Sequence, residues 1–252
     1  MSFRNVRTHY FHANASAIGG YLEKPLAKII PVQSPTSLSP SGGADEAATT
    51  NFQFEHVMSA SATRTRVEGS YIAGLPTTRA LAVVKDLNVL GVIHADELIA
   101  YISSEHPGEE PDVPIVKFGN TAINGLRIGD AILKVHLDTT LLDFSNGKRF
   151  PKRPYLYEKA LWKRADKKYD PDKGFLPCTL VRKIEIIHGK LAGKIVDTNI
   201  IEIPDIGRMH LAEFLLSGNS YELIMMRLEL GCPNVGQSSA SATKVNGQGG
   251  GG

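Results

Sequence analysis

Apolar and polar residues alternate along most of the chain, from about residue 50 to about residue 230. Within 221–230, Ile224, Met226 and Leu228 fall on one face of an extended chain, and Arg227 and Glu229 fall on the other. A period of two is typical of a strand with one buried face. The same alternation marks residues 51–58, 63–68, 131–138, 178–187 and 209–216, and residues 194–203 are dense in β-branched residues. The pattern predicts a mainly β protein.

Short turns connect the alternating segments. Gly129-Asp130 separates two of them, and a two-residue pair that begins with glycine is a recognised hairpin signal. Residues 217–220 form a second predicted turn, between 209–216 and 221–230. Strand and turn units that recur every 8 to 12 residues, roughly as they do here, are typical of sandwiches and barrels. We therefore expect an antiparallel β-sandwich or a barrel-like body.

Two segments fit the alternation less well. Residues 94–104 read either as a strand or as a short helix capped by Asp96, and the neighbouring strands favour the strand. Residues 154–168 begin at a proline and place Leu156, Ala160 and Leu161 at helical spacing, so they predict one amphipathic helix.

Composition divides the chain into three parts. Residues 31–50 are rich in Pro, Ser and Gly, and residues 236–252 contain six glycines and three serines. Such segments have little apolar surface to bury. We expect an N-terminal arm with a linker (1–50), a β-rich domain with a helical insertion at 148–170 (51–235), and a flexible, disordered tail (236–252).

The overall composition narrows the class of protein. Hydrophobic residues make up 42% of the 252 residues and the net charge is +2, which argues against wholesale disorder and against a generally basic nucleic-acid coat. No apolar run approaches the roughly 20 residues of a membrane-spanning helix. The N-terminal residues lack the apolar core of a secretory signal, so we expect a protein that is cytoplasmic or exported without a classical signal peptide. Cys178 and Cys232 read either as free thiols or as a disulfide between strands.

Charge is concentrated in one segment. Residues 148–168 contain nine Lys or Arg and two acids, a net charge of +7, which leaves 2 − 7 = −5 for the rest of the chain. Cations and aromatic faces together can bind a polyanion or a carbohydrate. The candidate ligand-binding residues are Tyr155, Tyr157, Trp162, Lys163, Arg164, Lys167 and Lys168. The alternative is a solvated helix whose charges meet an acidic neighbour, including a neighbouring subunit.

Two histidine–aspartate pairs are candidate metal ligands. His94 with Asp96 and His136 with Asp138 have the spacing that projects two ligands from one face of a strand. His210 and Glu213 could contribute to such a site. The alternative for each pair is a histidine hydrogen-bonded to its carboxylate.

The acidic loop 105–112 raises a similar question about Ca²⁺, with a solvated turn as the alternative. No cofactor is expected, although Ca²⁺ and Zn²⁺ are the metals that these residue types would suit.

Catalytic and nucleotide-binding motifs are not found in the sequence, which contains no Gly-x-Ser-x-Gly and no glycine-rich phosphate loop. Residues 78–96 with 125–129 resemble segments of bacterial β-rich proteins of the choice-of-anchor type. Residues 206–214 and 226–233 resemble an uncharacterised bacterial family. The resemblance implies a strand-built protein involved in surface or assembly roles, without a described activity.

These observations lead to three hypotheses of function. The first is a non-enzymatic structural protein that associates with itself through its β-rich body and flexible ends, as a homo-oligomer. The second is a module that binds carbohydrate or a polyanion through residues 148–168. The third is a metal-dependent hydrolase that uses His94, Asp96, His136 and Asp138.

Overall fold

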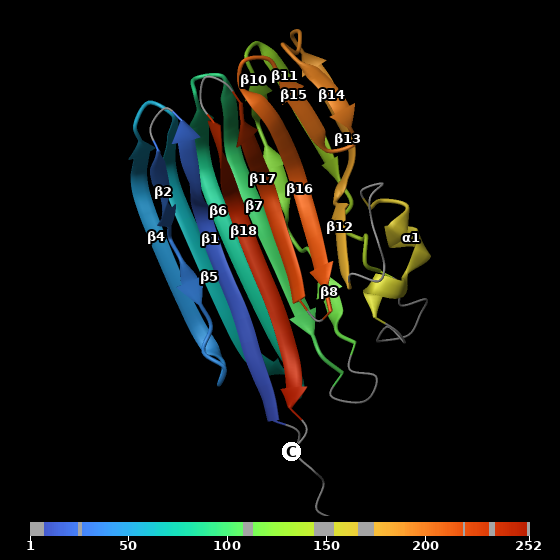
Figure 1. Ribbon diagram of the computed structural model, residues 1–252. Coiled ribbons are helices and arrows are strands. Elements are labelled where there is room, and N and C mark those ends of the chain that lie inside the picture. The colour runs from blue at the N-terminus through green and yellow to red at the C-terminus, as the bar shows by residue number, and fades with distance from the viewer. Residues whose placement is uncertain are drawn as a thin grey trace, which may run out of the picture.

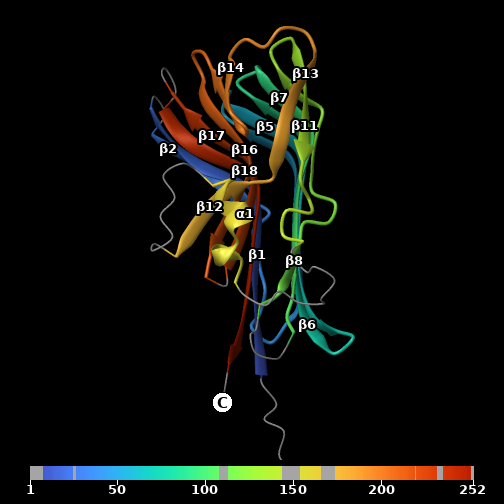
Figure 2. The ribbon, with the colours of Figure 1, turned by 90° about the vertical axis from the view of Figure 1, so that its right-hand side faces the viewer.

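The protein is a β-sandwich of two antiparallel sheets (Figure 1). The computed structural model describes residues 8–24, 27–107, 113–143, 154–165, 174–218, 220–231 and 235–250. The two sheets stack as separate layers, as the side view in Figure 2 shows. The expectation of a mainly β fold is confirmed, and the sandwich is the arrangement that the chain adopts.

The first sheet, sheet A, contains nine strands among the described residues. Seven form a continuous series in the order β14 (Lys194–Asp197), β15 (Ile200–Ile203), β16 (Gly207–Ser217), β17 (Ser220–Leu230), β18 (Val235–Gly250), β1 (Thr8–Lys24) and β2 (Lys28–Gln33). The short strand β12 (Phe175–Thr179) pairs with β16, and β3 (Thr36–Ser37) pairs with β1.

The second sheet, sheet B, also contains nine strands in the described part of the chain. Its series is β13 (Val181–His188), β11 (Ala131–Leu137), β10 (Leu126–Ile128), β7 (Ile93–Glu105), β6 (Leu75–Val89), β5 (Met58–Ile72) and β4 (Gly43–Phe54). The strands β8 (Ile115–Lys117) and β9 (Ala122–Asn124) both pair with β7.

Most of the strand predictions are confirmed. Residues 94–104 lie within β7, the Gly129-Asp130 pair connects β10 to β11, and β16 and β17 form the C-terminal hairpin. The segment 51–58 is not one strand, because Glu55 has a φ of 50° and begins the turn between β4 and β5. The segment 194–203 is likewise divided into β14 and β15.

The expectation of a disordered C-terminal tail is wrong. Residues 235–250 form β18, which pairs with β17 on one side and with β1 on the other. The serine and alanine side chains of this segment lie where the two sheets approach each other, since β18 contacts both β6 and β7 of sheet B. Small side chains suit that position because they let two backbones approach closely.

A serine joins the two sheets at this point. The Ser241 hydroxyl donates a hydrogen bond to the carbonyl oxygen of Ala82 (2.7 Å) and accepts one from the amide of Ala100 (3.0 Å). Ser241 is fully buried and has a φ of 58°. The buried alanines of the core come from both sheets and include Ala15, Ala17, Ala80, Ala82, Ala100 and Ala240. The layers separate toward the upper end of the sandwich (Figure 2).

The separate N-terminal arm is also corrected by the structure. Strand β1 lies inside sheet A, and much of the predicted linker forms β2, β3 and the first part of β4. The hydroxyl of Ser34 lies 2.7 Å from that of Thr63, and the Thr36 hydroxyl donates to that of Thr65 at 3.2 Å. These hydrogen bonds allow polar residues of the segment to be buried between the sheets.

The predicted helix at 154–168 is present only in short pieces. A 3₁₀ turn, η1, covers Tyr155–Tyr157, and α1 covers Lys159–Trp162. Glu158 between them is extended, with φ −81° and ψ 107°, which interrupts the helical hydrogen bonding. Residues 166–168 lie outside the described residues. No helix in the described part of the chain is long and apolar enough to cross a membrane.

Candidate functional site

The basic and aromatic segment does not present all its candidate ligand-binding residues to solvent. Tyr155 is buried, and its hydroxyl donates to the carbonyl oxygen of Pro114 (3.1 Å) and accepts from the amide of Val116 (3.4 Å). Burial raises the pKa of Tyr155 to about 12, against the smaller opposite effect of the Val116 amide. The expectation that Tyr155 contacts a ligand is therefore wrong, because the side chain is an internal anchor.

The remaining residues of that segment differ in exposure. Trp162 is partly buried against the core and donates from Nε1 to the carbonyl oxygen of Leu156 (2.7 Å). Tyr157 and Lys163 are exposed. Lys167 and Lys168 lie outside the described residues. The described part of this segment thus offers two exposed candidates for a ligand rather than a continuous surface.

Asp138 is the buried acceptor of an ion-pair cluster beneath α1. Its carboxylate lies 2.8 Å from Nη2 of Arg164 and 2.8 Å from Nη2 of Arg182, and the Thr140 hydroxyl donates to it at 2.9 Å. Burial opposes the ionisation of Asp138, but the hydrogen bonds from Arg182 and Thr140 and the charge of Arg164 outweigh it and lower the pKa. The cluster connects α1 to β13 and to the end of β11.

The four residues predicted as metal ligands do not form one site. His94 contacts the carbonyl oxygen of Gly91 (3.2 Å), and Asp96 accepts from Arg127 (2.8 Å). His136 lies 2.7 Å from Glu185 and Asp138 is held by arginines. In the chain as described, no group of three or more His, Cys, Asp or Glu side chains is gathered to hold a metal ion. The alternative was that each histidine bonds to the aspartate two residues on. His136 and Asp138 are both hydrogen-bonded, but His136 bonds to Glu185 and Asp138 bonds to arginines.

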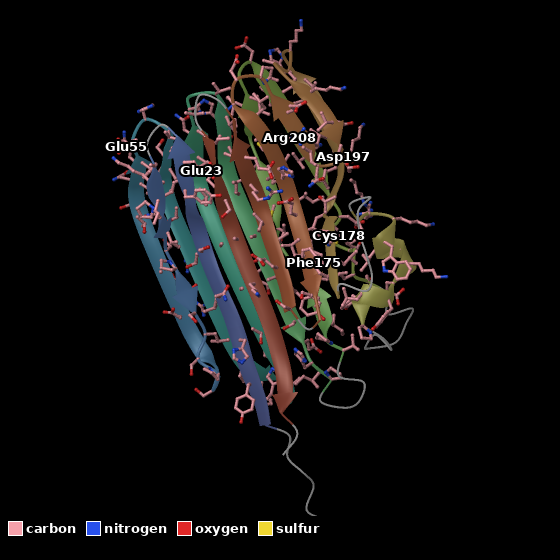
Figure 3. All side chains as sticks on the ribbon, in the orientation of Figure 1. Glu23, Glu55, Phe175, Cys178, Asp197 and Arg208 are labelled. Atoms are coloured by element: carbon pink, nitrogen blue, oxygen red, sulfur yellow. The ribbon has the colours of Figure 1, made fainter. Side chains whose placement is uncertain are left out.

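Of the two cysteines, Cys178 lies within the described residues. Cys178 on β12 is a buried, free thiol whose pKa is raised to about 12 by burial, with Arg164 acting in the opposite direction (Figure 3). Cys232 lies outside the described residues. The same is true of residues 108–112 of the predicted acidic loop.

A cluster of charged side chains lies on the outer face of β16 and β17. Arg227 donates two hydrogen bonds to Glu213, at 2.6 and 2.8 Å, and also pairs with Glu229. Nδ1 of His210 lies 3.3 Å from Glu213, and its Nε2 lies 3.5 Å from Glu229. The sequence indicated His210 and Glu213 as possible metal ligands but gave no reason to include Arg227, which comes from the neighbouring strand.

The chemistry of this cluster is that of a compact, mutually neutralising ion network. Burial opposes the ionisation of Glu213, but hydrogen bonds from Arg227 and His210 overcome it and lower the pKa to about 2. A bidentate arginine–carboxylate pair is the strongest type of side-chain ion pair. The cluster therefore stabilises the β16–β17 hairpin.

This network predicts acid sensitivity. The folded-state pKa of Glu213, about 2, lies below the ordinary value of 4.5, so its stabilisation is complete above that ordinary value and is lost as the pH falls toward 2. We expect Glu213→Gln to lower the free energy of unfolding by about 2 kcal/mol near neutral pH. The variant should then lose less of its stability than the wild type when denaturant unfolding is repeated under increasingly acidic conditions.

Glu46→Gln is the matched control, because Glu46 also pairs with an arginine (Arg64) but on an exposed surface. It should change the unfolding curve much less than Glu213→Gln. Equal pH profiles for the wild type and Glu213→Gln would contradict this account of the cluster.

One lateral side of the sandwich ends in β13 and β14. Among the described strands, β13 pairs only with β11 and β14 only with β15, so each has one edge without a strand partner. Ile186 and Ile187 on β13 and Val196 on β14 are exposed, with Ile187 59% accessible. We call this side the β13–β14 edge.

The opposite lateral side ends in β2 and β4. Strand β2 pairs only with β1, and β4 only with β5, within the described part of the chain. Ile29 is 77% accessible, and Val32 and Tyr21 beside it are exposed on the outer face of sheet A. We call this side the β2–β4 edge. Six of the eleven large apolar side chains that are exposed in the described part of the chain lie at or next to these two edges.

The comparisons with known proteins give a family but no activity. Searches of the curated proteins and of the solved structures found no match. The model of a family described as "Domain of unknown function (DUF8256)" matches residues 9–171, which span β1 to β11 and the helical turns η1 and α1. The resemblance to choice-of-anchor proteins stays a prediction. Because the match covers more than half of the 252 residues, the chain belongs to this family, Domain of unknown function (DUF8256).

Proposed function

We propose that this protein is a non-enzymatic structural protein that associates with itself through the lateral edges of its β-sandwich. One observation carries the proposal. On both lateral sides of the molecule, strand edges without a partner lie next to exposed apolar side chains. An open strand edge presents amide and carbonyl groups that another chain can pair with. Apolar side chains beside it gain free energy when a partner covers them.

The length and composition of β4 support the proposal. This edge strand covers twelve residues, Gly43–Phe54, and contains neither lysine nor proline. Natural proteins commonly protect a sheet edge with a short strand, a lysine or a proline. A long edge strand without these residues is suited to pairing with a second strand.

The route of association differs from the one expected from the sequence. The predicted flexible C-terminal tail is instead β18, paired on both sides within sheet A. Its backbone groups are therefore engaged inside the molecule. The contacts between copies are assigned to the sandwich edges.

Size-exclusion chromatography with light scattering tests the proposal directly. The purified wild type should give a mass above the 27.3 kDa of one chain, and that mass should rise with protein concentration. Negative-stain microscopy of the same fractions should show particles larger than one sandwich. Monomers alone, across a wide range of concentration, would contradict the proposed function.

The exposed apolar residues give a second prediction. Ile187→Ser combined with Val196→Ser should weaken self-association by about tenfold or more, since two apolar side chains would no longer be covered. Ile72→Ser is the control, because Ile72 is also exposed but lies at the turn between β5 and β6. An equal loss in the control variant, measured by light scattering at matched concentrations, would show that the effect is not specific to the edge.

A further inference from the structure

We infer that the copies associate head to tail, with the β2–β4 edge of one copy against the β13–β14 edge of the next. The inference rests on the proposed self-association and specifies which surfaces meet. It is carried by the charges of the two edges, the directions of the edge strands and the position of the apolar side chains.

The two edges carry opposite charge. Residues 43–55, which form β4 and the start of the following turn, contain three acids and no Lys or Arg, a net charge of −3, and Lys28 of β2 brings this edge to −2. Residues 181–194, from β13 to the first residue of β14, contain four Lys or Arg and one acid, a net charge of +3, and Asp197 at the end of β14 brings that edge to +2. Two copies that met through the same edge would bring like charges together, whereas unlike edges attract.

Part of this charge is already paired within the chain, but weakly. Glu46 pairs with Arg64, and Lys183 with Glu185, through side chains that are largely exposed. Exposed ion pairs contribute little, so these groups can take new partners at low cost. In the described part of the chain, no ion pair involves Lys190 or Lys194, and both are exposed.

The strand directions allow the same arrangement in both sheets. The series from β13 to β4 has seven strands, each antiparallel to the next, so β13 and β4 run in the same direction. The same count applies from β14 to β2 in sheet A. A second copy placed beside the first by translation would therefore pair β4 with β13 in parallel and continue sheet B. Strand β2 contains Lys28 and Pro31, which protect a strand edge, so β2 would meet β14 through side chains rather than through a continuous strand pair.

The two edges lie on opposite lateral sides of the sandwich. Figure 1 shows β2 at the upper left of the sandwich and β14 at the upper right, and Figure 3 shows Glu55 and Asp197 on the same two sides. Exposed apolar side chains lie on both edges, Ile29 and Val32 on β2 and Ile187 and Val196 on β13 and β14, so lateral contact between unlike edges would cover apolar surface of both copies. Contact between unlike edges leaves one free edge at each end, which produces rings or filaments rather than closed dimers.

Reciprocal charge reversal tests the inference. Asp45→Lys with Glu46→Lys changes the charge of 43–55 by four, from −3 to +1, and Lys190→Glu with Lys194→Glu changes 181–194 from +3 to −1. In the head-to-tail arrangement each double variant alone should associate at least about tenfold more weakly than the wild type. An equimolar mixture should recover wild-type association, because each variant then meets an edge of opposite charge. Circular dichroism melting checks that both variants fold.

The outcomes separate this inference from the proposed function. If the wild type assembles and Lys190→Glu with Lys194→Glu assembles equally well, the head-to-tail arrangement is wrong and self-association still holds. If both variants are impaired but their mixture is not restored, the charge pairing between unlike edges is wrong. If the wild type is monomeric at every concentration, the proposed function fails and this inference fails with it.

Discussion

Asp138→Ala is expected to lower the free energy of unfolding by about 3 to 5 kcal/mol. Asp138 is 7% exposed and accepts from two arginines and from Thr140. The carboxylate is the anion that Arg164 and Arg182 share. Its removal leaves two guanidinium groups side by side without an anion, and that of Arg164 is partly buried. Breaking a buried ion pair in this way costs more than the pair itself contributes, because the remaining charge loses both water and partner. Denaturant unfolding with an unchanged m-value would measure the effect.

Asp96→Asn provides the control, since Asp96 also accepts from an arginine, Arg127, at 2.8 Å. Both of those side chains are about half exposed, so we expect a loss of less than about 1 kcal/mol. The lowered pKa of Asp138 also predicts how the stability changes with pH. Its stabilisation is complete above the ordinary aspartate pKa of 3.8 and is lost as the pH falls below it, and Asp138→Ala should remove that dependence. Similar losses for the two variants would contradict the buried cluster.

Ser241→Ala is expected to cost about 2 to 3 kcal/mol. The substitution removes a hydroxyl that joins the two sheets and takes one hydrogen-bond partner from Ala82 and one from Ala100. Backbone groups that lose a partner in a dry interior cannot recover it from water. Thermal and denaturant unfolding of the purified variant measure the loss.

Ser238→Ala on the same strand is a close control. Ser238 is also buried, but its hydroxyl has no hydrogen-bond partner among the described residues. Removing it should be neutral or slightly stabilising, because a buried hydroxyl without a partner is itself unfavourable. If Ser238→Ala were as destabilising as Ser241→Ala, the hydrogen bonds to sheet B would not explain the effect.

The strand content could be predicted from the sequence because the core residues are large and alternate. Phe214 and Leu216 on β16 and Leu223 on β17 are buried as the period of two requires. Chain reversals with special backbone geometry were harder to predict. Glu55 adopts a positive φ although it is neither glycine nor asparagine, so the turn after β4 has no composition signal.

The C-terminal strand could not be predicted from hydropathy. Ser238, Ala240 and Thr243 of β18 are buried as a strand interior requires, but serine, alanine and threonine give almost no contrast against polar neighbours. Burial there depends on the close approach of the opposite sheet, which is a tertiary property. The lack of proline after residue 235 was the available signal for a strand.

The candidate sites show the same limit. The spacing of His136 and Asp138 placed both side chains correctly on or beside a strand, but their partners, Glu185 and Arg164, are distant in sequence. Tyr155 counted as an exposed aromatic residue in the sequence because nothing nearby indicated that its hydroxyl bonds to the backbone of Pro114 and Val116, about 40 residues away. The two lateral edges depend on the order of strands in each sheet, which local patterns do not determine.

Hydrogen exchange of the wild-type amides at low and high protein concentration tests the central claim most directly. Amides at an open strand edge exchange readily, and pairing with another copy protects them. The account predicts protection that increases with concentration in peptides from β4 and β13, while the turn between β5 and β6 stays unchanged. Exchange that is independent of concentration at both of these edge strands would contradict it.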